Sequence, residues 1–254
     1  MVLSALLLRT LRATYQQTLA WLFCATFIPF MVLALVVTLG QFKPTLGAKL
    51  MRGWGKGMLW VSGVRLVFDA DVARELAQRR ARVMTFNHCS TLDLFVGASM
   101  VPDAAVIVVK KELIYLPLIG QVILLLDVIT LDRKNRQRAT DSLRAAARRL
   151  RSGQHSAMIS PEGTRSPLGT VGPFKTGPFH LAIEAQVPIV PLVWHGCGDL
   201  YPRDAWHCTP GVVRVSMLPE VPTAGRTAAD VRVLADEVRA GYAAALGFDL
   251  GGSP

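Results

Sequence analysis

The chain has 254 residues, a formal net charge of +10 and 51% hydrophobic residues, a size that favours one domain or at most two around a buried core. Charged residues make up 18%, so the composition is apolar for a soluble enzyme, and the mean hydropathy of +0.36 excludes a protein with many membrane spans. The positive charge leaves nucleic acid, anionic membranes and anionic substrates as candidate partners.

The first predicted element is an apolar segment near the N-terminus. Residues 13–42 contain no charged side chain, and residues 19–39 exceed the length of ~18 apolar residues that marks a membrane helix. A cleavable signal peptide fits poorly, because its apolar region is usually ~7–15 residues long. Pro29 is expected to kink this helix or to allow a turn. A single span, a shallow hairpin with both ends cytoplasmic and a buried core helix remain as alternatives.

After residue 56, short runs rich in Val and Ile alternate with helical patterns. The runs predict strands at 64–68, 83–86, 105–109, 128–131, 157–159, 189–194 and 212–218, and helices at 135–151, 177–185 and 228–246. This alternation predicts an α/β fold with a mainly parallel central sheet flanked by helices. We therefore divide the chain into a membrane-associating helical segment, 1–56, and a domain, 57–254.

Much of the positive charge falls within one of these predicted helices. Residues 133–151 contain eight Lys or Arg and one Asp. This segment is either a solvated helix face or a surface that binds anions or faces a membrane.

The four cysteines contain no C-x-x-C pair, and no His/Cys cluster has the spacing of a zinc site. In a chain of this length they predict reduced thiols, no metal and a working domain in the cytoplasm.

The first polar motif follows the predicted strand 83–86 and opens a predicted helix. It reads Asn87-His88-Cys89-Ser90-Thr91-Leu92-Asp93. A histidine accepts a proton near neutral pH, and an aspartate bonded to its other ring nitrogen fixes the tautomer. The motif therefore predicts a catalytic pair, His88 and Asp93, at the carboxyl end of a strand. The alternative is an ordinary polar turn in which Ser90 or Thr91 caps the helix.

The second polar motif, residues 160–166, follows the predicted strand 157–159. Gly163 would let backbone approach a ligand, and Arg165 offers a planar fork that matches phosphate. An ordinary charged turn is the alternative. A P-loop is excluded, because Lys175 follows Phe174 rather than glycine. Further basic residues lie at predicted strand ends on the side of His88, namely Lys110, Lys111 and Arg133.

These motifs resemble, in order, those of the phospholipid-biosynthesis acyltransferase family, whose type is 1-acyl-glycerol-3-phosphate acyltransferase. The resemblance runs from about residue 83 to residue 192. The matching blocks are the H-x4-D block at His88 to Asp93, Asp132-Arg133, the block Pro161-Glu162-Gly163-Thr164-Arg165-Ser166, and residues 187–192, with Phe174-Lys175-x-Gly177 linking the last two.

The resemblance implies transfer of a fatty acyl chain from acyl-CoA or acyl-carrier protein to the free hydroxyl of 1-acyl-glycerol-3-phosphate, giving phosphatidic acid, with no cofactor and no metal. It implies that His88 is the general base, that Asp93 orients it, and that no covalent acyl-enzyme forms. The residues that it implies for the acceptor-phosphate site are Lys110, Lys111, Arg133, Glu162, Gly163, Thr164 and Arg165. It places the protein at the inner (cytoplasmic) membrane, with the catalytic domain on the cytoplasmic side.

Four residues at three places depart from the common family pattern: Ser160 in place of Phe, Thr130-Leu131 in place of Phe-Ile, and Thr176 in place of Lys. They leave open another lysolipid acceptor, such as a lysophospholipid or a lyso-ornithine lipid. A non-catalytic membrane lipid-binding protein is a further alternative, against which the intact His88 and Asp93 pair argues. The apolar segment and the lack of interleaved aromatic and basic residues argue against nucleic acid as a partner.

Overall fold

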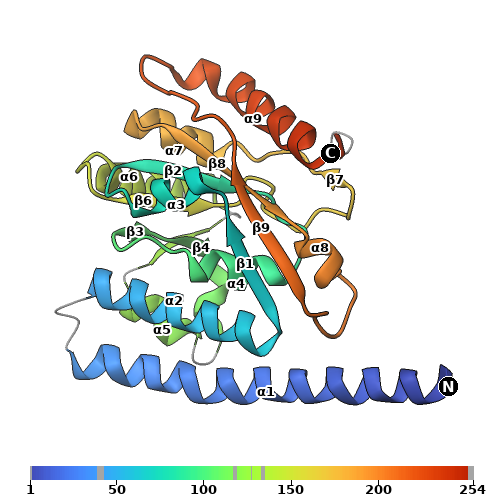
Figure 1. Cartoon of the computed structure of the whole chain (residues 1–254). Coiled ribbons are helices and arrows are strands. Elements are labelled where there is room, and N and C mark those ends of the chain that lie inside the picture. The colour runs from blue at the N-terminus through green and yellow to red at the C-terminus, as the bar shows by residue number, and fades with distance from the viewer. Residues whose placement is uncertain (1, 39–42, 117–118, 127, 133–134, 251–254) are drawn as a thin grey trace.

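The computed structural model describes residues 2–38, 43–116, 119–126, 128–132 and 135–250 (Figure 1). Its centre is a six-stranded sheet of order β1-β9-β8-β2-β6-β3. The strands are β1 Val64–Phe68, β2 Arg82–Phe86, β3 Ala105–Val106, β6 Ser156–Ile159, β8 Ile189–His195 and β9 Gly211–Met217. Strands β8, β2, β6 and β3 run parallel, whereas β9 pairs antiparallel with β8 and parallel with β1. The prediction of a mainly parallel α/β sheet is confirmed.

Strand β2 lies at the centre of this sheet and is covered on both faces. Val83 pairs with Ala157 of β6 on one side and with Ile189 of β8 on the other, and all three side chains are fully buried. Continuous apolar strands are typical of a parallel sheet that has helices on both faces. Because β2 and β6 are parallel neighbours, the loops that follow them leave the same edge of the sheet.

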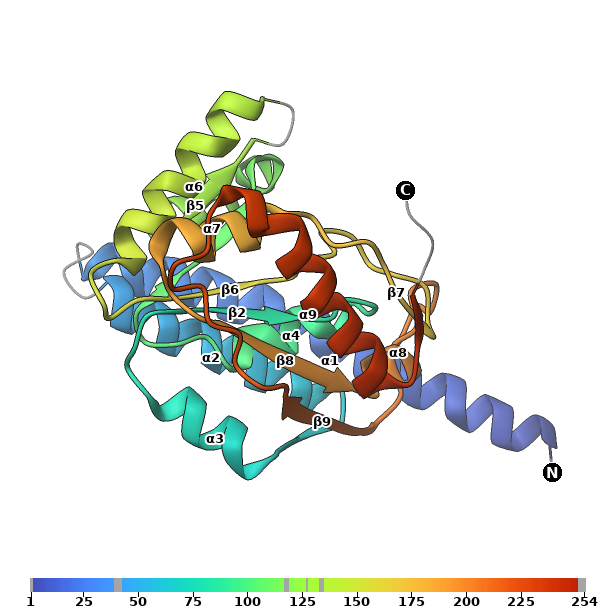
Figure 2. The same cartoon turned by 90° about the horizontal axis from the view of Figure 1, so that it is seen from above.

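Helices cover both faces of the sheet (Figures 1 and 2). On one face lie α6 Arg136–Leu150, α7 Gly177–Ala185 and α9 Val231–Leu246, which share a core with buried Leu181, Leu234 and Tyr242. On the other face lie α4 Leu92–Ser99 and α2 Lys43–Val61, around buried Leu92 and Trp194. Two short helices, α3 Ala70–Ala77 and α8 Cys197–Leu200, complete this layer.

Helix α1, Val2–Val37, lies along the outside of α2 (Figure 1). It continues through Pro29, so the turn expected at that residue does not form. Apolar packing holds the helix on both sides of the proline: Phe27 lies against α2, and Met31 and Leu35 pack with Leu50. These contacts explain why the helix continues although Pro29 cannot donate an intrahelical hydrogen bond.

Glycines on α2 allow neighbouring helices to approach closely. A Cβ atom at Gly57 would lie 2.2 Å from the ring of Phe23 on α1, and one at Gly55 would lie 2.5 Å from the backbone nitrogen of Ser99 on α4. Helix α2 is therefore packed between α1 and the domain. It also runs across residue 56, where the sequence analysis places the boundary between the membrane-associating segment and the domain. That boundary stays a prediction.

Smaller elements extend the fold beyond the central sheet. The predicted strand 105–109 divides into β3 and β4, Val108–Lys110, and the predicted strand 128–131 forms β5, Ile129–Leu131, which pairs with β4 in a separate sheet. The 3-10 helix η1, Lys111–Tyr115, and α5, Ile119–Leu125, connect these two strands. The predicted helix 228–246 begins as a 3-10 turn, η2 Ala228–Asp230, before α9, and β7 Thr170–Val171 pairs with β10 Asp249–Leu250.

Candidate active site

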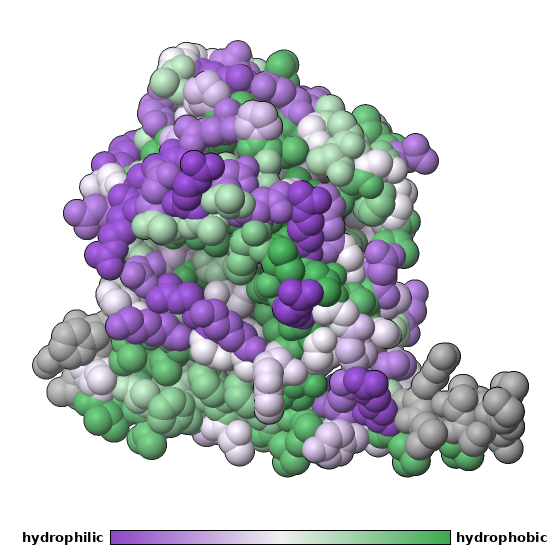
Figure 3. All heavy atoms as spheres, in the orientation of Figure 1, coloured by the Kyte–Doolittle hydropathy of each residue, from purple (hydrophilic) through white to green (hydrophobic). Residues whose placement is uncertain are grey.

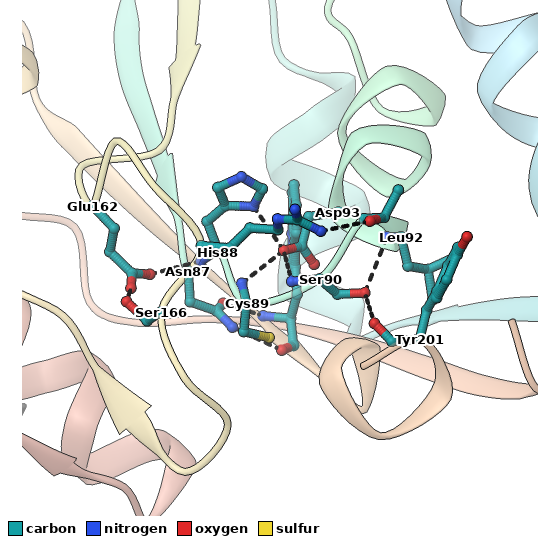
Figure 4. Close-up of polar contacts among 12 residues, drawn as sticks. Asn87, His88, Cys89, Ser90, Leu92, Asp93, Glu162, Ser166 and Tyr201 are labelled. Carbon is teal, nitrogen blue, oxygen red and sulfur yellow. Dashed lines mark hydrogen bonds and ion pairs between the residues drawn. The ribbon is translucent and has the colours of Figure 1, made fainter. Parts of the chain in front are cut away.

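The loop between β2 and α4 brings His88 and Asp93 together (Figure 4). The Nδ1 atom of His88 lies 2.8 Å from Oδ2 of Asp93. The histidine side chain is 27% exposed and the aspartate side chain 1% exposed. The predicted pair is therefore assembled, with a buried carboxylate behind a partly accessible ring.

The same carboxylate oxygen organises the loop around the histidine. Asp93 Oδ2 also accepts hydrogen bonds from the backbone N–H groups of Cys89 and Ser90, each at 2.8 Å. Asp93 lies in the first turn of α4, where the helix dipole favours a negative charge. One side chain thus fixes both the path of the loop and the orientation of the ring.

This geometry assigns chemical roles to the two ring nitrogens. A carboxylate only accepts hydrogen bonds, so Nδ1 of His88 carries the proton that it donates to Asp93. The lone pair is then on Nε2, at the far side of the ring in Figure 4. An imidazole in this state is suited to take a proton from a hydroxyl, while the carboxylate stabilises the imidazolium that forms.

A cavity of about 500 Å³ opens beside His88. This volume is in the range of ligand sites, ~300–1,000 Å³. Its polar lining residues include His88, Ser160 and Arg165. Its remaining wall is largely apolar and includes Met51, Leu94, Val101, Ile107, Val109 and Met158. A cavity that combines a few polar groups with a largely apolar wall fits an amphipathic ligand.

Arg165 is brought to the same cavity as His88, as its motif predicts. Its guanidinium donates a hydrogen bond from Nη1 to Oγ1 of Thr91, at 2.8 Å. Thr91 precedes α4 but makes no capping bond with its side chain, so its hydroxyl is free to hold the arginine. The arrangement places a guanidinium in the same cavity as His88 and Asp93.

Glu162 occupies a different position from the one that its implied role suggests. It is only 4% exposed, and its Oε1 accepts a hydrogen bond from the backbone N–H of His88 at 2.6 Å. Its Oε2 accepts from the hydroxyl of Ser166 and from the backbone N–H of Gly172. Burial raises the pKa of this carboxyl, against the opposing effect of these hydrogen bonds. The substrate-binding role implied for Glu162 stays a prediction.

The remaining residues implied for the phosphate site lie in different surroundings from one another. Gly163 adopts a positive φ of 70°, which glycine tolerates, and Thr164 is exposed. Lys111 pairs with Asp132, with Nζ 3.2 Å from Oδ2. Arg133 lies outside the described residues, as does the side chain of Lys110. Among the residues described, no three His, Cys, Asp or Glu side chains gather as a metal site.

The two nucleophilic side chains next to His88 are not prepared for attack. Burial, followed by the charges of Asp93 and Glu162, raises the pKa of the Cys89 thiol to about 12. The hydroxyl of Ser90 is buried, donates to the carbonyl of Tyr201 at 2.6 Å and accepts from the N–H of Leu92. The site therefore supports direct transfer rather than a covalent intermediate.

Sequence reasoning assigned no role to three residues that support the loop. The side-chain amide of Asn87 bonds both the N–H and the C=O of Trp194, at 2.8 and 3.0 Å, and ties the loop to β8. Ser166 bonds Glu162, and Tyr201 accepts the bond from Ser90. Asn87 and Ser166 lie within the two motifs, so their place in the sequence could have identified them as site residues. Tyr201 lies outside both motifs, and nothing in the sequence marks it.

Known proteins share both the sequence and the fold of this chain. A family model described as Acyltransferase matches residues 71–195. The chain is 35% identical over 208 residues to human 1-acyl-sn-glycerol-3-phosphate acyltransferase alpha, covering 82% of this chain and 73% of that protein. It is 33% identical over 238 residues to the human beta enzyme, covering 93% of this chain and 85% of that protein.

A solved structure extends the likeness to the fold. The crystal structure of the 1-acyl-sn-glycerophosphate acyltransferase PlsC from Thermotoga maritima matches 93% of this chain and 97% of that chain, with a TM-score of 0.73. At 23% identity this likeness shows the fold alone. Since the identity to the human enzymes extends over most of both chains, the protein belongs to the 1-acyl-sn-glycerol-3-phosphate acyltransferase family.

Proposed function

We propose that this protein transfers a fatty acyl chain from acyl-CoA or acyl-carrier protein to the free hydroxyl of 1-acyl-glycerol-3-phosphate, giving phosphatidic acid. The observation that carries the proposal is the 2.8 Å His88–Asp93 pair, which shares an amphipathic cavity with Arg165. Membership of the family supports the same acceptor, since the human relatives are named for it.

The reaction follows from the geometry of the pair. Nε2 of His88 takes the proton of the acceptor hydroxyl as its oxygen attacks the thioester carbonyl. The carbon–sulfur bond then breaks, and the thiolate leaves and receives the proton from the imidazolium. Asp93 holds the ring and stabilises its charge throughout. The guanidinium of Arg165 is suited to hold the acceptor phosphate through two parallel hydrogen bonds.

Helix α1 brings the site to a lipid surface. Residues 10–37 of α1 are long and apolar enough to cross a membrane, and most of this stretch is not buried by the protein. Hydrophobic residues form a band over α1 along the lower edge of Figure 3. Because α1 lies along α2, which itself packs on the domain, the helix would rest in the membrane interface rather than cross it. The cytoplasmic face of the inner membrane is the proposed location.

The test is an acceptor panel with purified full-length protein in detergent. Labelled acyl-CoA and acyl-carrier protein are each combined with 1-acyl-glycerol-3-phosphate, a neutral-headgroup lysophospholipid and a lyso-ornithine lipid. We expect labelled phosphatidic acid as the main product. Faster turnover of either other acceptor would reassign the substrate, and no transfer to any acceptor would refute the acyltransferase.

A further inference from the structure

Glu162 is a buried carboxylate that hydrogen-bond donors of the protein surround. It is 4% exposed, and its oxygens accept hydrogen bonds from the backbone of His88, the hydroxyl of Ser166 and the backbone of Gly172. Burying a carboxylate is costly unless donors surround it. One of these donors is the backbone N–H of His88.

The segment 162–166 forms hydrogen bonds with both the N–H and the carbonyl of His88. The N–H of His88 donates to Oε1 of Glu162 at 2.6 Å, and its carbonyl accepts from the N–H of Ser166 at 2.8 Å. The direction of a side chain is set by the backbone that carries it. These two hydrogen bonds therefore fix the direction in which the side chain of His88 leaves the backbone. The hydrogen bond to Asp93 then fixes the rotation of the ring (Figure 4).

Gly172 completes this arrangement by close approach. Its N–H donates to Oε2 of Glu162 at 3.2 Å and to Oγ of Ser166 at 3.1 Å. A Cβ atom at this position would lie 2.4 Å from Oγ of Ser166 and 3.3 Å from Oε2 of Glu162. Only glycine lets the backbone reach both groups.

We propose that Glu162, held by Ser166 and Gly172, is a positioning residue for His88 and not a ligand of the acceptor. Its carboxylate fixes the backbone of the general base. It also places a negative charge near the ring, which stabilises the imidazolium that forms during transfer. The kinetic part of this inference rests on the proposed function, whereas the structural part does not.

The kinetic test compares Glu162→Gln and Ser166→Ala with wild type in detergent. Glutamine keeps the shape but has one acceptor oxygen, so an NH₂ group must face either the N–H of His88 or that of Gly172. We expect Glu162→Gln to lower kcat about 10²-fold, the effect of a small misplacement of a catalytic group. Ser166→Ala should lower it about 10-fold, because one supporting bond is lost. In both variants the acceptor KM should stay close to that of wild type.

The structural test measures amide hydrogen exchange of His88 in the same proteins. We expect slow exchange in wild type and faster exchange in both variants. Ser156→Ala is the matched control: its buried hydroxyl donates to the carbonyl of Arg80 at 2.8 Å, in strand β6 rather than in the loop. It should leave both kcat and the exchange of His88 unchanged.

A raised acceptor KM with normal kcat in Glu162→Gln would show an acceptor ligand and overturn the proposal. Rapid exchange of the His88 amide in wild type would overturn it even if Glu162→Gln failed to fold. Ser166→Ala with unchanged kcat and exchange would do the same. If wild type acylates none of the acceptors, the proposed function fails, while the exchange measurement still decides whether Glu162 positions His88.

Discussion

His88 and Asp93 differ in exposure although they are joined by one 2.8 Å hydrogen bond. The aspartate side chain is 1% exposed and accepts three N–H groups through one oxygen, whereas the histidine is 27% exposed and borders the cavity. The proposed orienting group is thus buried inside the protein, and the proposed base is accessible from the cavity.

Replacing His88 should remove most catalysis without changing the fold. We expect His88→Ala to lower kcat by ~10²–10⁴-fold, the contribution of a positioned general base. His180→Ala is the control, because that histidine is exposed on α7. Turnover is measured with labelled acyl thioester, and folding by circular dichroism. A folded His88→Ala protein with near-normal turnover would contradict the mechanism.

Cys89 should be chemically inert despite lying next to the base. With a thiol pKa of about 12, only ~10⁻⁴ of it is ionised at pH 8, compared with about a quarter of an ordinary thiol. We expect iodoacetamide to modify Cys89 only after unfolding, and mass spectrometry after incubation with donor alone to show no acyl adduct. Rapid labelling in the native protein, or an adduct on Cys89 or Ser90, would argue for a covalent route.

Arg165 should act on the acceptor rather than on the thioester. We expect Arg165→Ala to raise the acceptor KM at least ~10-fold, because a bidentate bond to phosphate is lost, and Arg165→Lys to restore only part of this. Donor KM should change little. Arg232→Ala, at an exposed position on α9, provides the control. An unchanged acceptor KM in Arg165→Ala would remove this residue from the phosphate site.

The exposed face of α1 should determine membrane binding. Leu22, Leu33 and Val37 are 56%, 60% and 70% exposed, so the protein leaves their apolar surface uncovered. We expect wild type to remain with membranes through a high-salt wash, and the triple change to Gln to release it without unfolding. Val233→Gln, an exposed apolar position on α9, should have no such effect. Soluble wild-type protein without detergent would show that α1 is not a membrane element.

Gly55→Ala should destabilise the protein although alanine is the better helix former. In an exposed helix this change stabilises by ~1 kcal/mol. Here the new Cβ would lie 2.5 Å from the backbone nitrogen of Ser99 and 2.7 Å from the carbonyl oxygen of Phe95, so α2 and α4 must separate. We expect a clearly lowered Tm. Gly177→Ala, whose nearest neighbour would be 4.0 Å away, should keep its Tm.

Local patterns predict the helices and strands, and they identify His88 and Asp93 as the candidate catalytic pair. The strand runs and helical spacings identify segments by side-chain type alone, and they matched the strands of the central sheet closely. His88 and Asp93 are only five residues apart, so a turn into a helix is enough to join them. The position of Asn87 before His88 was also visible, although its partner, the backbone of Trp194, was not.

Long-range packing decided the rest. Glu162 and His88 are 74 residues apart, and only the parallel pairing of β2 with β6 places their loops at one edge and turns the carboxylate to the backbone of the base. The same holds for Pro29, where apolar residues before and after it pack against α2, and for β4 and β5, which pair outside the central sheet. Residue type and spacing are local properties, so the sequence is enough to predict which residues carry the chemistry. Which of these residues line the cavity, and which bond the backbone of His88, depends on contacts between distant segments and is seen only in the tertiary structure.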